Sequence, residues 1–106
     1  MSRPYALRLT ESAESDLADI WSYIASEASE ETASQFVGSL GAHLEQLRHA
    51  PYSGPPRPQL AERLRMLPHG KYAVYYIVRE FEVVVVRVIH GARDHAAMAM
   101  RGAFQV

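Results

Sequence analysis

Three basic side chains in the second half of the sequence could act together on a phosphate group: Arg65, Arg87 and His90. Cleavage of an RNA phosphodiester needs a base near the 2′-hydroxyl, an acid near the leaving oxygen and cations that stabilise the developing charge. The three residues could supply two of these roles, but no well-placed carboxylate or second histidine supplies the base. The residue pattern favours a structural alternative, in which Arg87 pairs with a carboxylate such as Asp94 and His90 closes a strand by hydrogen bonding.

The histidines do not form a recognisable metal-binding pattern. His43 and His49 are six residues apart and His90 and His95 are five apart, whereas two ligands on one helical face are usually four apart. The absence of cysteine excludes disulfides, thiolate metal sites and cysteine nucleophiles. There is also no glycine-rich phosphate loop and no nucleophile elbow. We therefore expect neither a metal nor a cofactor.

The formal net charge of −1 conceals a strong asymmetry along the chain. Residues 1–50 carry three basic and eight acidic groups, a net charge of −5, and residues 51–106 carry eight basic and four acidic groups, a net charge of +4. Seven of those eight cations are arginines, which suit bidentate contacts with carboxylates or phosphates. The split indicates one face for an anionic partner, although acidic helices that simply precede basic strands would produce it too.

The length of 106 residues suits a single domain over residues 1–106. A hydrophobic fraction of 48% is typical of a folded protein. No apolar run approaches the roughly 20 residues that span a bilayer, and residues 1–5 lack the apolar stretch of a signal peptide. We therefore expect a cytoplasmic protein with no membrane partner.

The first half of the chain predicts one strand followed by two helices. Residues 5–9 alternate apolar and mixed side chains, as in a short strand. Thr10 is a candidate N-cap, and apolar residues recur at helical spacing over residues 11–27. Ser29 is a second candidate cap, and a further apolar stripe continues to about His49. The short break between the two helices predicts an antiparallel hairpin.

The second half predicts three strands. Four prolines within residues 51–58 end the second helix and indicate a surface connection. Residues 67–70 are typical of a type I turn, residues 80–81 mark a tight reversal, and the segment at 95–106 is either a short helix or a C-terminal arm. Strands are expected at 63–67, 71–79 and 83–90, and the last is apolar on both faces and should be central. The fold class is therefore α+β with the order β-α-α-β-β-β, in which an antiparallel sheet packs on the helical hairpin.

A series of short motifs runs from Tyr5 to about Asp94. They are Leu9-Thr10, Ala13, Asp16-Leu17, Ile20, Tyr23-Ile24, Ala33, Leu47 before Pro51 and Gly54, Leu64-Arg65, Gly70-Lys71-Tyr72, Tyr75-Tyr76 and Arg87-Val88-Ile89-His90-Gly91-Ala92-Arg93-Asp94. In this order they resemble the ParE branch of the RelE/ParE toxins of bacterial type II toxin–antitoxin systems. The closing His-Gly-Ala-Arg-Asp run is the most specific of them.

The resemblance implies the same β-α-α-β-β-β fold and a growth-inhibiting, non-enzymatic toxin that poisons DNA gyrase. It also implies a cognate antitoxin of the ribbon-helix-helix type, through which alone the toxin would reach operator DNA. The residues expected to act on the target are Arg65, Tyr72, Arg87, His90, Arg93 and Asp94. Those expected to bind the antitoxin are Leu17, Trp21, Phe36, Leu40 and Arg79.

Two alternatives remain open at this point. RelE-like relatives cleave mRNA on the ribosome, and Arg65 and Arg87 lie where such toxins place basic catalytic residues, with His90 as a third candidate. The C-terminal catalytic tyrosine of those toxins is absent here, because no tyrosine follows Tyr76. The second alternative is a non-toxic interaction module on the same fold.

Overall fold

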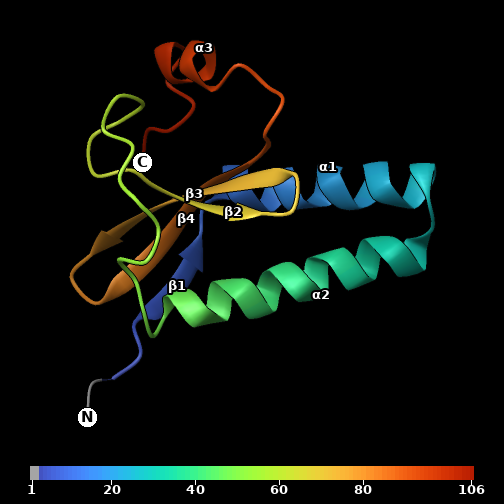
Figure 1. The fold of residues 1–106 in the computed structure, drawn as a ribbon, viewed down its shortest axis with the longest axis horizontal. Coiled ribbons are helices and arrows are strands. Elements are labelled where there is room, and N and C mark those ends of the chain that lie inside the picture. The colour runs from blue at the N-terminus through green and yellow to red at the C-terminus, as the bar shows by residue number, and fades with distance from the viewer. Residues whose placement is uncertain (1–2) are drawn as a thin grey trace.

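The computed structural model, which describes residues 3–106, is a four-stranded sheet with helices on both sides (Figure 1). Helices α1 and α2 form a hairpin that covers one face of the sheet and extends beyond it, whereas α3 lies on the other side. Among residues 3–106, no helix is both long and apolar enough to cross a membrane. In chain order the elements are β1 (Ala6–Leu9), α1 (Glu11–Glu27), α2 (Glu30–Leu47), β2 (Arg65–His69), β3 (Tyr72–Arg79), β4 (Glu82–His90) and α3 (His95–Met100).

The strand order is β1-β4-β3-β2, so the predicted α+β arrangement and the central position of β4 are confirmed. The sheet is mixed, however, where we expected it to be antiparallel, because β1 pairs with β4 in parallel. Two tight hairpins make β2, β3 and β4 alternate in direction, so β4 runs in the same direction as β2. The long helical connection lets β1 join the edge of β4 in that direction too.

Both helices begin at the predicted capping residues. The side chain of Thr10 accepts a hydrogen bond from the Ala13 amide, and that of Ser29 accepts one from the Thr32 amide. The far end of α2 is tied back to the start of β1, where Arg48 Nε donates to the Tyr5 carbonyl at 2.7 Å. The helical hairpin therefore brings the chain back beside the start of β1 before β2 begins.

The first β-hairpin turns later than we predicted. β2 includes Pro68 and runs to His69, and the turn is formed by Gly70 and Lys71 instead of residues 67–70. Pro68 is tolerated because β2 is an edge strand, where a missing amide leaves no ladder bond broken. Gly70 adopts a φ of +57°, which glycine reaches without steric cost. The tight reversal predicted at residues 80–81 is confirmed.

A β-bulge interrupts β4. Tyr75 pairs with Arg87 and Tyr76 pairs with Val85, which leaves Val86 as an extra residue. Simple alternation places Val85, Arg87 and Ile89 on one face, and Val86, Val88 and His90 on the other. That assignment is wrong, because Val85 and Val88 face the α1–α2 hairpin, whereas Val86 and Ile89 face the opposite side.

Apolar side chains bury both faces of the sheet. The core facing the hairpin consists of Ala13, Ile20, Leu40, Leu44, Leu47, Val74, Tyr76, Val83, Val85 and Val88. The second cluster consists of Leu64, Ala73, Tyr75, Ile77, Val84, Val86, Ile89, Met98 and Phe104. Met98 and Phe104 come from α3 and the chain that follows it, so the segment left open as helix or arm is a short helix with a packed tail.

Helix α1 replaces β1 as the neighbour of β4 where β1 ends. The Thr10 amide donates to the Val85 carbonyl at 3.0 Å, and the Thr10 hydroxyl donates to the Val86 carbonyl at 2.8 Å. Nearly two turns further along the chain, Asp16 Oδ2 of α1 accepts the Val88 amide at 2.9 Å. The same carboxylate forms a bidentate pair with Arg87, at 2.7 and 2.9 Å. We call this group of Asp16, Arg87 and Val88 the Asp16 clasp.

Two histidines connect α2 with β2. The Nδ1 atoms of His43 and His69 are 2.8 Å apart, and the Ser39 hydroxyl lies 3.4 Å from His69 Nε2. This bond requires one protonated and one unprotonated Nδ1, so it is incompatible with two imidazolium rings. Burial, and then the proximity of His43, lower the pKa of His69 below its ordinary value of 6.5.

We expect Asp16→Asn to lower the free energy of unfolding by about 1–3 kcal/mol, because it leaves the half-buried Arg87 guanidinium without its counter-ion. Urea denaturation followed by circular dichroism measures this change. The matched control is Asp19→Asn on the same helix, where the side chain is exposed and the change should stay within about 0.5 kcal/mol. Equal losses in the two variants would contradict the role of the clasp.

The histidine pair should make stability depend on pH. The unfolded chain binds a proton at His69 more readily than the folded chain, so its contribution is complete above pH 6.5 and decreases as the pH falls below that value. Urea midpoints measured between pH 7.5 and 5 should therefore decline less steeply in His69→Gln than in the parent. His49→Gln, at an exposed position, should retain the parent slope, and an unchanged slope in His69→Gln would refute this prediction.

Candidate functional site

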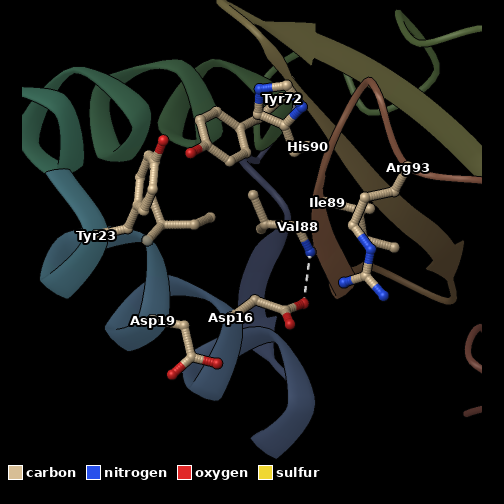
Figure 2. Close-up of a pocket in the computed structure, with 9 residues that line it drawn as sticks. Asp16, Asp19, Tyr23, Tyr72, Val88, Ile89, His90 and Arg93 are labelled. Atoms are coloured by element: carbon tan, nitrogen blue, oxygen red, sulfur yellow. Dashed lines mark hydrogen bonds between the residues drawn. The ribbon is translucent and has the colours of Figure 1, made fainter. Parts of the chain in front are cut away.

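A cleft of about 510 Å³ opens between α1 and the last residues of β4 (Figure 2). Helix α1 contributes one wall, the end of β4 contributes the floor, and Tyr72 of β3 and Arg93 complete the rim. The lining residues are Asp16, Asp19, Ile20, Tyr23, Tyr72, Val88, Ile89, His90 and Arg93.

The structure brings three of the predicted target-inhibition residues together in this cleft: Tyr72, His90 and Arg93. Tyr72 and His90 are cross-strand neighbours, with ring centroids 5.2 Å apart in an edge-on arrangement. Phe36 of α2 also packs against Tyr72, with ring centroids 5.2 Å apart. Burial, reinforced by Tyr23, raises the pKa of Tyr72, so its hydroxyl remains protonated at neutral pH.

Hydrogen bonds fix the state of the His90 ring. The Ala92 amide donates to His90 Nδ1 at 3.0 Å, so the neutral ring carries its proton on Nε2 and presents a donor there. The His90 carbonyl in turn accepts from His95 Nε2 at 3.0 Å. The structural alternative for His90, in which it closes the strand by hydrogen bonding, is confirmed.

A second histidine anchors the segment that carries Arg93. Because His95 Nε2 donates to the His90 carbonyl, His95 Nδ1 accepts the hydroxyl of Tyr75. The Tyr75 ring also packs against Phe104, with centroids 4.6 Å apart. This contact holds the start of α3 against the sheet and fixes both ends of the short connection on which Arg93 lies.

Arg87 pairs with a carboxylate, as the structural alternative predicted, but the partner is Asp16 instead of Asp94. Asp94 lies beyond the end of β4 and caps α3, where it accepts the Ala97 amide at 3.0 Å. The hydrogen bond to Asp16 raises the pKa of Arg87 and keeps it charged. Arg87 therefore does not line the cleft, and its guanidinium is already bound by Asp16.

Arg65 also has protein partners and does not line the cleft. Its guanidinium donates to the Gly54 carbonyl at 2.7 Å and to the Tyr52 carbonyl at 3.2 Å, and it lies 4.9 Å from the centre of the Tyr52 ring. These contacts hold the proline-rich connection against β2. Gly54 is required there, because an added Cβ would lie 2.7 Å from both the Met66 carbonyl and the Tyr76 hydroxyl.

The residues expected to bind an antitoxin have different environments. Leu17, Trp21 and Phe36 are half-buried on the helical hairpin, and Arg79 is exposed at the end of β3. Leu40 is only 1% exposed and belongs to the core between α2 and the sheet, so its expected place on a partner-binding surface must be corrected. The apolar stripe to which Leu40 belongs is equally compatible with a place in the core and with a place on a partner-binding surface, so the sequence did not distinguish them.

Asp16, Asp19 and Tyr23 line the cleft but were not among the expected site residues, although Asp16 and Tyr23 belong to the motifs of the family resemblance. Asp16 did carry a signal, because it shares a helical face with the apolar residues Ala13, Leu17 and Ile20. A carboxylate in that position needs a buried partner. Asp19 and the exposed Tyr23 carry no such signal, since similar residues are common on solvated helices.

The cleft is suited to binding a dipolar group. The charge of Asp16 is neutralised by Arg87, which leaves Asp19 on the α1 wall opposite Arg93 on the other side (Figure 2). Tyr72 and the Nε2 proton of His90 add donors. Within residues 3–106, no group of three or more histidine, aspartate or glutamate side chains could hold a metal ion.

Solved structures of toxin–antitoxin proteins share this fold. The chromosomal ParDE system from P. aeruginosa contains a chain that is 21% identical, with a TM-score of 0.73, and the alignment covers 84% of this chain and 98% of that one. The toxin–antitoxin complex RelBE2 from Mycobacterium tuberculosis contains a chain that is 23% identical, with a TM-score of 0.57 and coverage of 83% and 99%.

Sequence similarity is more specific than the shared fold. Toxin ParE1 from Caulobacter vibrioides is 33% identical over 96 residues, which cover 88% of this chain and 97% of the relative. The family described as the ParE toxin of the type II toxin–antitoxin system parDE matches residues 7–95. The match includes both helices of the hairpin, all of β2, β3 and β4, and every residue of the cleft. The chain therefore belongs to the ParE toxin family of type II toxin–antitoxin systems.

Proposed function

We propose that this ParE-family toxin inhibits bacterial growth by poisoning DNA gyrase in the cytoplasm and that a cognate antitoxin neutralises it. The family match over residues 7–95 carries the proposal. The antitoxin is of the ribbon-helix-helix type and provides the only route by which the toxin reaches operator DNA.

The surroundings of the two arginines favour a gyrase inhibitor over a RelE-like mRNA endonuclease. Asp16 holds Arg87 in a bidentate pair, and the backbone of the proline-rich connection holds Nη1 of Arg65. Both guanidinium groups are therefore oriented by protein partners, which disfavours a role in stabilising a phosphorane. His90 Nδ1 already accepts the Ala92 amide. Residues 77–106 contain no tyrosine that could serve as the catalytic tyrosine of RelE-like toxins.

The cleft provides the surface for the target. Arg93 is exposed at its rim, and its side chain makes no hydrogen bond or ion pair with the rest of residues 3–106. Tyr72 and His90 present further hydrogen-bond donors beside it. These three residues lie in the half of the chain with a net charge of +4, which matches an acidic surface on the target.

The antitoxin surface is the overhanging helical hairpin. Leu17, Trp21 and Phe36 leave part of their apolar surface exposed there, and the Trp21 indole already donates to Ser34 at 3.3 Å. An amphipathic helix of a partner could cover these side chains with its own apolar face. Arg79, at the far end of β3, would pair with an acidic residue of the same antitoxin.

We expect Arg93→Ala to abolish most of the inhibition of DNA supercoiling by gyrase, so that at least about tenfold more toxin is needed for the same effect. A plasmid supercoiling assay with purified gyrase measures this dose. Arg101→Ala is the matched control, because Arg101 is also exposed but lies at the end of α3, away from the cleft. Circular dichroism should show that both variants are folded.

Two outcomes would replace this proposal. If the toxin leaves supercoiling unaffected but cleaves mRNA on the ribosome, the RelE-like alternative is correct. If expression without an antitoxin is harmless to the host, the chain is an interaction module on the toxin fold.

A further inference from the structure

The floor of the cleft contains an unpaired stretch of the β4 edge. The Gly91 amide donates to the Lys71 carbonyl on the β3 side, and backbone groups alternate between the two sides of an antiparallel strand. The backbone groups of Val88 and His90 therefore point away from β3, toward the cleft. Of these, the Val88 amide is taken by Asp16 and the His90 carbonyl by His95.

One acceptor and one donor remain on this edge, the Val88 carbonyl and the His90 amide. Neither forms a hydrogen bond with any other part of residues 3–106. In a parallel pair, a residue on one strand bonds to the two neighbours of its counterpart on the other strand. Its amide donates to the carbonyl of the residue before the counterpart, and its carbonyl accepts the amide of the residue after the counterpart. β1 pairs with β4 according to this rule: Ala6 lies opposite Glu82, and its amide donates to the Phe81 carbonyl.

We propose that the cleft binds an extended segment of another protein, which pairs in parallel with β4 and places one residue opposite Ile89. That residue would donate to the Val88 carbonyl and accept from the His90 amide. The antiparallel arrangement is blocked, because it would need the Val88 amide and the His90 carbonyl. The bound segment would continue the line of β1 along the same edge of β4. β1 itself covers only the first part of that edge, because the chain then turns into α1.

The surroundings define the side chains of the bound segment. The residue opposite Ile89 faces the same side as Ile89, where Figure 2 shows the Arg93 side chain alongside. An aspartate or glutamate fits there. The residues before and after it face the same side as Val88 and His90, toward Ile20, Tyr23 and Tyr72, so apolar side chains fit these positions. The recognised pattern is apolar–acidic–apolar.

Charge favours a peptide over a nucleic acid strand. Asp19 lies on the α1 wall without an ion pair among residues 3–106. Its negative charge offsets the positive charge of Arg93 across the cleft. A polyphosphate backbone would meet this carboxylate, and the cleft has no surplus of cations to compensate. A peptide backbone is neutral and supplies the donor and acceptor that the edge lacks.

The test is an NMR titration of the ¹⁵N-labelled full chain with the capped tripeptide Ac-Val-Glu-Val-NH2, up to about 10 mM. The amide resonance of His90 should shift, because this amide gains an acceptor. Methylation of the glutamate nitrogen removes the donor to the Val88 carbonyl and should weaken binding at least about tenfold. No shift at His90, or equal binding of the methylated peptide, would overturn the proposal.

Variants test the acidic position. Arg93→Ala should abolish the preference for Ac-Val-Glu-Val-NH2 over Ac-Val-Gln-Val-NH2, and Arg101→Ala should retain it. A preference that survives Arg93→Ala would refute the assigned register. Two further outcomes would overturn the proposal. If oligothymidylate shifts the His90 amide resonance and the tripeptides do not, the cleft binds nucleic acid. If the His90 amide resonance shifts with protein concentration alone, a second copy of the chain occupies the cleft. Binding is read directly, so the result does not depend on whether the chain is toxic.

Discussion

The arrangement of this toxin depends on how the edge of β4 is completed after β1 ends. A central strand that is buried on both faces needs hydrogen-bond partners on both edges, since unpaired buried backbone groups are costly. β1 pairs with only the first half of β4. Thr10 and Asp16 satisfy the next three backbone groups. Because both residues belong to the start of α1, the same bonds set the position of the helix against the sheet.

The bulge at Val86 makes the Asp16 clasp possible. Without the bulge, regular alternation would turn the Val88 amide toward β3, where the Asp16 carboxylate could not accept it. With it, the amide of Val88 and the guanidinium of Arg87 converge on one carboxylate. The irregularity also separates the regular ladder beside β1 from the open edge beside the cleft.

Much of the fold could be predicted from local patterns. Thr10 and Ser29 are capping residues in the sequence and in the structure, and the valine-rich run became the central strand. The bulge could not be predicted, because consecutive valines carry no alternation in which a shift would show. The partner of Arg87 was missed because Asp94 is seven residues away along the chain, whereas Asp16 is 71 away and is brought near only by tertiary structure. The cleft was predicted in part, through Tyr72, His90 and Arg93, since these lie near the ends of two adjacent strands.

The separation of 71 residues between Asp16 and Arg87 has a consequence for how the protein folds during its synthesis. The helical hairpin and the β2–β3–β4 meander consist of local contacts, which form early at small cost in loop entropy. The parallel pairing of β1 and the clasp must wait until the end of β4 has left the ribosome. The wall and the floor of the cleft thus come from opposite ends of the chain. A nascent chain therefore has no assembled cleft until β4 and Arg93 have emerged from the ribosome.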